Sequence, residues 1–259
     1  MENWRGFLKE EHTFDPSKFP FPAPATQQQA DKIASGGSED GVHPEDDQAV
    51  VTHPDNLSVT KLKPSQTAIK LGQSLGMATD QLVKGEIGGN LGAVISTDLY
   101  IMDGHHRWAA TIFAAGEKGK VGGILIDIPG EQLVKVLAAV GDHFHPGVRK
   151  GASTVSIFDA QPDDIDPIID KLIAEGNKYA EPPFSGEQAK EAFEKNFGSV
   201  EQAKEVFKSR LPLIQKEPPP SWAENRDKMP VLEPEKGEPE KAGIKIKRGE
   251  VDIYAPYKK

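Results

Sequence analysis

The sequence predicts a mixed α/β fold, and three observations favour it. Short apolar runs bounded by glycine, proline or polar turn residues recur between residues 57 and 128, which is typical of strands. Segments with apolar residues at helical spacing lie between these runs. Two of the runs, 91–95 and 99–102, are separated by a tight-turn sequence and indicate a hairpin. A small α/β (α+β) unit with a mixed sheet accounts for this order of elements.

The elements of this unit follow one another closely. Ser65 is placed to cap a helix that reaches about Lys84, and the helix that follows Gly104 ends at Gly116. A glycine-rich loop at 85–92 separates the first helix from the hairpin and serves either as a phosphate cradle or as a lid. The elements expected in chain order are a strand at 57–60, a helix at 65–84, the hairpin, a helix from 105, a buried strand at 121–128 and a helix at 131–141.

A second, helical region is expected after the α/β unit. Residues 155–158 are either linker or an extra strand, and apolar residues then repeat at helical spacing up to Gly176. Ser185 and Ser199 each have a glutamine three residues later, the pattern of a capping box at a helix start. The two helices that they begin should pack as a hairpin through Phe193, Phe197 and Phe207.

Composition divides the chain of 259 residues into four regions. Residues 1–54 combine scattered prolines with a polar stretch and are expected to be a flexible N-terminal arm. The α/β domain occupies 55–150, the helical region 151–211, and a proline-rich charged tail 212–259. In the N-terminal arm, Trp4–Leu8 either docks on a protein partner or is a frayed end. The tail contains two peptides typical of docking, Pro220–Ala223 and Met229–Leu232, and Ile244–Tyr254 either adds a strand to another sheet or folds back on its own domain.

Charge and composition exclude several classes of function. The chain has 31 basic and 40 acidic residues and a formal charge of −9, which disfavours broad binding to a nucleic-acid backbone. It contains no cysteine and therefore has no disulfide, thiolate metal site or thiol nucleophile. No apolar run approaches the roughly 20 residues of a membrane span, and Met1–Leu8 is not a signal-peptide pattern. We expect a soluble protein of the cytoplasm, or of a virion if the source is viral.

The candidate site is the stretch Asp103–Arg107, where an apolar strand runs into an alanine-rich helix. Gly104 can adopt the left-handed turn that directs backbone N–H groups outward. The helix that follows leaves its first N–H groups unpaired and places partial positive charge at the same point. Because His105, His106 and Arg107 add donors and charge, we expect an anion, and specifically a phosphate, to bind here.

The order of these features resembles the ParB/sulfiredoxin superfamily. Leu57–Val59, Lys63–Gln66, a helix, a glycine loop, a hairpin and then Asp103–Arg107 carry the resemblance, which covers less than half of the chain. The Asp-Gly-His-His-Arg form is closest to ParB-like free serine kinases dependent on a nucleoside diphosphate and to ParB-like nucleases. The first residues, Met1–Leu8, also resemble the starts of phage proteins.

The resemblance implies roles for the residues of the motif. Gly104, His105, His106 and Arg107 would contact phosphate, and Asp103 would orient Mg²⁺ or accept a proton. Neighbouring residues of a helix point about 100° apart, so we expect one histidine to face the anion while the other packs or bonds to a neighbouring strand. The alternative is that both histidines cap and fill the fold.

The chain departs from the kinase-like members near Gln66, where they carry a catalytic glutamate. A glutamine side chain does not accept a proton near neutral pH, so Gln66 cannot be a general base. Either Glu86 or Asp103 supplies the base, or the protein binds a phosphate compound without transferring it. ParB-like clamps carry a glutamine in this neighbourhood, which favours binding.

Two further features admit more than one interpretation. His143 and His145, together with the motif, could form a metal cluster, or they could place favourable charge at a helix end. Trp108 is either a core residue, the simpler interpretation, or a platform for stacking a base.

Three hypotheses of function follow. The first is binding of a nucleotide or phosphorylated small molecule, with hydrolysis or phosphoryl transfer assisted by Mg²⁺. The second is a DNA-binding or nuclease module, which the net charge disfavours. The third is a phage virion or assembly protein with an inactive ParB-like fold and with protein partners bound through its arms.

Overall fold

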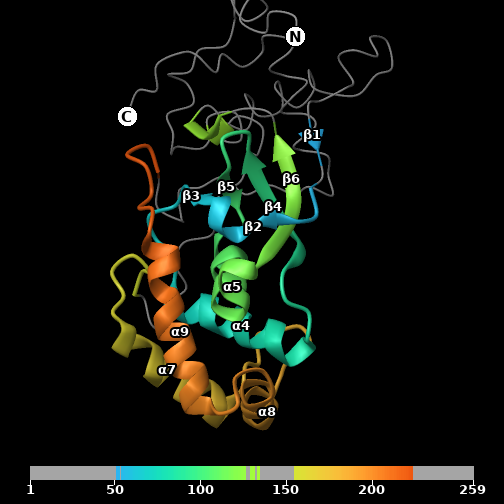
Figure 1. The fold of residues 1–259 in the computed structure, drawn as a ribbon, viewed down its shortest axis with the longest axis vertical. Helices are drawn as coiled ribbons and strands as arrows, with labels where there is room; N and C mark the ends of the chain where they lie inside the picture. The colour runs from blue at the N-terminus through green and yellow to red at the C-terminus, as the bar shows by residue number, and fades with distance from the viewer. Residues whose placement is uncertain (1–50, 53, 127–128, 132, 135–154, 224–259) are drawn as a thin grey trace, which may run out of the picture.

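A computed structural model of the chain describes residues 51–52, 54–126, 129–131, 133–134 and 155–223. These residues form a mixed α+β fold with a six-stranded sheet and five α-helices, which confirms the predicted fold class (Figure 1). The strands are β1 (Val51–Thr52), β2 (Leu57–Ser58), β3 (Lys63–Pro64), β4 (Gly89–Ser96), β5 (Tyr100–Asp103) and β6 (Lys120–Ile126).

The sheet combines parallel and antiparallel pairs. Its strands lie in the order β1, β6, β4, β5, β3, and β2 also pairs with β6. Strands β4 and β5 form the predicted antiparallel hairpin, with Val94 opposite Asp103. Strand β6 is parallel to β4, and β3 is parallel to β5, with Pro64 opposite Ile101. Strand β3 pairs with Tyr100 and Ile101 only, so the end of β5 that carries Asp103 is paired with β4 and extends past β3.

The helices connect the sheet to the far end of the molecule. Figure 1 shows the sheet towards one end, α7, α8 and α9 at the other, and α4 and α5 between them. The long helix α9 runs beside α5 (Figure 1), and its Phe207 ring lies 5.7 Å from the ring of Phe113 in α5. The helices are α4 (Leu71–Lys84), α5 (His105–Ala115), α7 (Ile165–Glu175), α8 (Gly186–Phe197) and α9 (Val200–Gln215).

One hydrophobic core joins the sheet to the helical region. It extends from Val59 and Ile95, on the sheet side, to Phe193 and Phe207 in α8 and α9. The rings of Phe193 and Phe197 both meet the ring of Phe207 nearly edge-on, as the predicted helical hairpin requires. The region predicted at 151–211 therefore shares its interior with the α/β domain.

The helical signals in this region are confirmed locally. The hydroxyl oxygens of Ser185 and Ser199 accept hydrogen bonds from the backbone N–H groups of Gln188 and Gln202. Helix α9 continues past the predicted boundary at residue 212 and contains Pro212. Its last turn is held by packing, since Ile214 is buried in the core.

The predicted helix at 65–84 is wrong at its beginning. Helix α4 starts at Leu71 after the N-cap Lys70, and Ser65 does not cap it. The Ser65 hydroxyl instead donates to the carbonyl oxygen of Ile101 in β5, because residues 65–70 cross the end of that strand. This crossing segment becomes one wall of the candidate site.

Two smaller predictions also differ from the structure, whereas the interpretation of Trp108 as a core residue is confirmed. The strand expected at 57–60 stops at Ser58, and a 3₁₀ turn follows from Val59 to Lys61. The carbonyl oxygen of Val59 accepts a hydrogen bond from the indole nitrogen of Trp108, which is a core residue. Of the strand considered at 155–158, only the bridge between Ser156 and Lys70 forms.

Several predicted segments lie outside the described residues. They include the arm at 1–50, most of the helix expected at 131–141, the pair His143 and His145, and the tail from residue 224. The described start of the tail folds back on the domain, because the Trp222 ring meets Tyr100 of β5 at 5.0 Å. Among the described helices, none has the length and apolar character needed to cross a membrane.

Candidate functional site

The junction between β5 and α5 contains the left-handed glycine that the sequence predicts. Gly104 has φ +98°, follows the last residue of β5 and is the N-cap of α5. A Cβ atom at this position would lie 3.1 Å from the Cβ of Ala93 in β4. The backbone therefore turns from strand to helix at a point where both conformation and space favour glycine.

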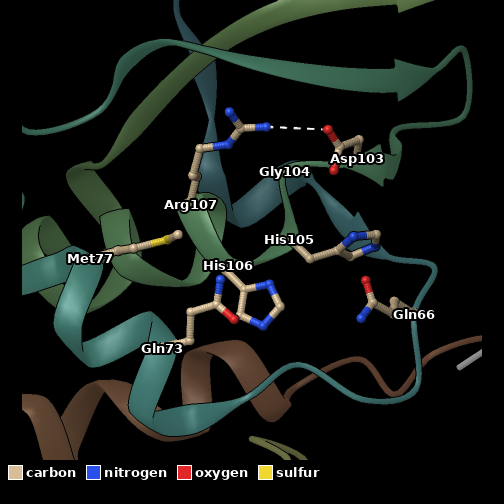
Figure 2. Close-up of a pocket in the computed structure, with 8 residues that line it drawn as sticks. All are labelled: Gln66, Gln73, Met77, Asp103, Gly104, His105, His106 and Arg107. Atoms are coloured by element: carbon tan, nitrogen blue, oxygen red, sulfur yellow. Dashed lines mark hydrogen bonds and ion pairs between the residues drawn. The ribbon is translucent and has the colours of Figure 1, made fainter. Parts of the chain in front are cut away.

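A cavity of about 190 Å³ opens at this junction. Figure 2 shows Arg107 and Asp103 on one side, Gln66 and Gln73 on the opposite side, and the two imidazole rings between them. The cavity is lined by Gln66, Gln73, Met77, Asp103, Gly104, His105, His106 and Arg107. The structure thus brings together six of the seven site residues predicted from the sequence.

Both histidines are buried and bonded to the segment that crosses above them. The Nε2 atom of His105 accepts a hydrogen bond from the backbone N–H of Ser65 at 3.1 Å, and that of His106 accepts one from Lys70 at the same distance. Each Nε2 must therefore carry a lone pair rather than a proton. The prediction that only one ring would bond to the fold differs from this arrangement, although both rings still line the cavity.

Asp103 and Arg107 form an ion pair across the first turn of α5. Arg107 Nη2 lies 3.3 Å from Asp103 Oδ2, and the side chains are 38% and 25% exposed. This carboxylate contacts one nitrogen of a guanidinium that has five N–H donors. Since both side chains line the cavity, Arg107 can donate to a bound anion as well as to Asp103.

Gln66 lies in the crossing segment and is 2% exposed. Its amide nitrogen donates to the carbonyl oxygen of Ala68 at 2.8 Å. Its carboxamide oxygen lies on the other side of the side chain, towards the histidine rings in Figure 2. This residue therefore presents a fixed acceptor to the cavity.

The structure does not bring Glu86 to the site. It follows Gly85, which ends α4, and its backbone N–H donates to Gln81 at the end of that helix. Its side chain is exposed, and it is not among the residues that line the cavity. Because Gln73 and Met77 in the cavity wall belong to the first half of α4, Glu86 is more than two helical turns further along the chain.

Gln73 and Met77 are the lining residues that sequence reasoning missed. They are four residues apart on α4 and so lie on one face of that helix. A helix assigned from Ser65 gave no reason to select this face. The sequence does contain their i, i+4 spacing, which places them on one face of a helix. That spacing points to the cavity only when α4 is known to pack against α5.

The glycine loop at 85–92 is held mainly by contacts away from the cavity. The backbone N–H of Gly88 donates to the side-chain oxygen of Gln81, whose amide nitrogen donates to Thr111 in α5. At its end, β4 contains a bulge between Asn90 and Ala93, and the Gly92 backbone passes near the Arg107 guanidinium. Bulges of this kind are common beside functional sites because they redirect side chains.

Metal binding depends on oxygen and nitrogen ligands near one another. Within the described residues, no group of three or more His, Asp or Glu side chains is arranged to hold a metal ion. Asp103 contributes one carboxylate, and Gln66 contributes one amide oxygen, to the same cavity. Mg²⁺ is commonly bound by one or two carboxylates together with substrate phosphates and water, so Asp103 is the described cavity residue that could contribute a carboxylate to it.

The fold and the site together define a mixed α+β protein with a polar cavity at a strand–glycine–helix junction. Comparison of the chain with protein-family models, curated proteins and solved structures gave no match.

Proposed function

We propose that this cavity binds the phosphoryl group of a nucleotide or of a phosphorylated small molecule. The principal support is the start of α5, where the first intrahelical bond is donated by Trp108 to Gly104. No side chain caps the helix at Gly104, and the positive end of the helix dipole lies at the junction where the cavity opens. Anionic oxygens complement the positive end of a helix.

Arg107 adds a full positive charge to the partial charge of the helix end. Its guanidinium lines the cavity and is held in place by Asp103. Arginine suits phosphate because its planar group can donate two parallel hydrogen bonds to adjacent oxygens. The combination of a helix start and an arginine on one cavity therefore favours a phosphoryl group over a neutral ligand.

The size of the cavity limits what it encloses. Its volume of about 190 Å³ lies below the roughly 300–1,000 Å³ typical of pockets that enclose a drug-sized ligand. A phosphoryl group with the adjacent part of a sugar or acceptor is of suitable size. The remainder of a nucleotide would extend into solvent or against other parts of the chain.

Catalysis at this site would depend on Asp103. It is the carboxylate among the described residues that line the cavity, whereas Gln66 cannot take up a proton and Glu86 is elsewhere. If Mg²⁺ binds, Asp103 and the ligand's phosphate oxygens would hold it, and the ion would offset charge on the phosphoryl group. We propose that the activity is phosphoryl transfer or hydrolysis in the cytoplasm. Both reactions require that the cavity first bind the phosphate compound.

The test compares Arg107→Ala with the wild type in calorimetric titrations of phosphate, nucleoside mono-, di- and triphosphates, each with and without Mg²⁺. Loss of a charged hydrogen bond of about 1.5–3 kcal/mol should weaken binding by about ten- to a hundredfold. Lys190→Ala is the matched control, since it also removes one positive charge but lies in α8, where Lys190 pairs with Glu194.

Equal affinities for the wild type and Arg107→Ala would refute the proposal. A parallel titration with duplex DNA at several salt concentrations tests the second hypothesis. Affinity for DNA that falls steeply as salt is added would favour a DNA-binding module instead. No detectable binding of DNA at low salt would exclude such a module.

A further inference from the structure

The Gln66 side chain presents a hydrogen-bond acceptor that has no role in binding the phosphoryl group. Its amide nitrogen faces the carbonyl oxygen of Ala68. A carbonyl oxygen can only accept a hydrogen bond, so the nitrogen of the carboxamide must be on that side. The orientation of the amide is therefore fixed by chemistry, and Oε1 is the atom left to the cavity (Figure 2).

This oxygen receives no hydrogen bond from the described residues. Gln66 is 2% exposed, and its bond to Ala68 is its one hydrogen bond within the described part of the chain. An acceptor removed from bulk water is unfavourable unless a donor reaches it. Gln66 lines the cavity, so a ligand bound there can supply that donor in place of water.

The position of Gln66 is held by the site itself. The neighbouring residue, Ser65, donates its N–H to His105 and its hydroxyl to Ile101. Gln66 is thus held next to helix α5, at whose start Gly104 and Arg107 line the cavity. Figure 2 places Gln66 across the histidine rings from Arg107, so the two ends of the cavity differ in chemistry.

We infer that the ligand is a phosphomonoester that carries a hydroxyl or amino group close to its phosphate. Its phosphoryl group would lie at Gly104 and Arg107, and its hydroxyl or amino group would donate a hydrogen bond to Gln66 Oε1. This inference rests on the proposed function and narrows its ligand class. The Gln66 oxygen attracts a hydroxyl hydrogen but repels a second anionic group, so it disfavours pyrophosphate in the same cavity.

The test uses two probes of similar size, glycerol 3-phosphate and n-propyl phosphate, which differ in their hydroxyl groups. Calorimetric titration of the full chain should give about three- to tenfold tighter binding of glycerol 3-phosphate, the value of one ordinary hydrogen bond. Pyrophosphate, tested in the same series, should bind more weakly than glycerol 3-phosphate.

Two variants isolate the acceptor. Gln66→Met and Gln66→Glu both lose the amide bond to Ala68, but only Gln66→Glu retains an acceptor oxygen. We expect Gln66→Met to bind both monoesters equally. We expect Gln66→Glu to keep the preference for the hydroxylated probe while its added negative charge weakens binding of every phosphate. Circular dichroism and thermal unfolding of each variant establish that it is folded.

The outcomes separate this inference from the function on which it rests. Equal binding of the two monoesters by the wild type, or tighter binding of pyrophosphate, would overturn the inference while Arg107-dependent phosphate binding still stood. If Gln66→Met still bound glycerol 3-phosphate more tightly than n-propyl phosphate, the inference would also be overturned, because another group would then accept the hydroxyl's hydrogen bond. If no phosphate probe bound the wild type, both the inference and the proposed function would fail.

Discussion

Arg107 is held by a weak ion pair with Asp103, which another anion could replace. Its ion pair with Asp103 is partly exposed, and pairs of that kind contribute about 0–1 kcal/mol to stability. The pair therefore does little to hold the fold together. In the proposed function, the pair orients the guanidinium at the start of α5, where a bound anion would add to the contact with Asp103 or replace it.

Gly104, by contrast, has a structural requirement that a substitution should expose. An alanine there must adopt φ near +98° and approach Ala93 closely, so we expect Gly104→Ala to lower the free energy of unfolding by about 1–3 kcal/mol. Gly85→Ala is the control, since Gly85 has φ +71° and a Cβ added there would meet no atom within 4 Å. Chemical denaturation should show the larger loss at Gly104, and equal losses would contradict a role for the contact with Ala93.

At the scale of elements, the segment at 65–70 and helix α5 form one unit. Residues 36 and 40 positions apart in the chain are joined by the bonds from Lys70 to His106 and from Ser65 to His105. The same segment is bonded on its other side to Ile157, whose N–H donates to Ile69. The histidines therefore position Gln66 over the cavity in addition to lining it.

On the scale of the whole molecule, aromatic contacts among α5, α8 and α9 show that the helical region supports the helix that carries the candidate site. Phe207 touches Phe113 of α5 as well as Phe193 and Phe197. Arg210 of α9 donates to the carbonyl oxygen of Phe113, and burial lowers the pKa of its guanidinium. Movement of α9 would therefore be transmitted to the helix that carries the motif.

A single large-to-small substitution tests this coupling. Phe207→Ala should destabilise the protein by about 3–5 kcal/mol, because the side chain is fully buried and leaves a cavity. Unfolding should remain a single transition that includes the sheet, since one core serves both parts. Tyr179→Ala, at a side chain 82% exposed, should change stability by less than about 0.5 kcal/mol.

Calorimetry combined with near- and far-ultraviolet circular dichroism would reveal the alternative. Two separate transitions in Phe207→Ala, with the sheet still folded after the helices melt, would mean that the helical region is a separate domain.

Local patterns were sufficient for many backbone features. Gly104 at a strand–helix junction, the serine–glutamine caps of α8 and α9 and the β4–β5 hairpin are each specified by residues close together in the chain. The error at Ser65 shows the limit of such patterns. A serine that precedes a helix-like segment caps it only if no better partner exists, and here the carbonyl of Ile101 is that partner.

The sequence by itself determined that a left-handed glycine joins a strand to a helix start at Asp103–Arg107, because helix starts, glycine conformations and charge are local properties. Only the tertiary structure decided which distant residues complete the cavity. It placed Gln66, Gln73 and Met77 there and left Glu86 outside, because those positions depend on how α4 and the crossing segment pack against α5. Packing between segments is a property of the whole core, and no short stretch of sequence encodes it.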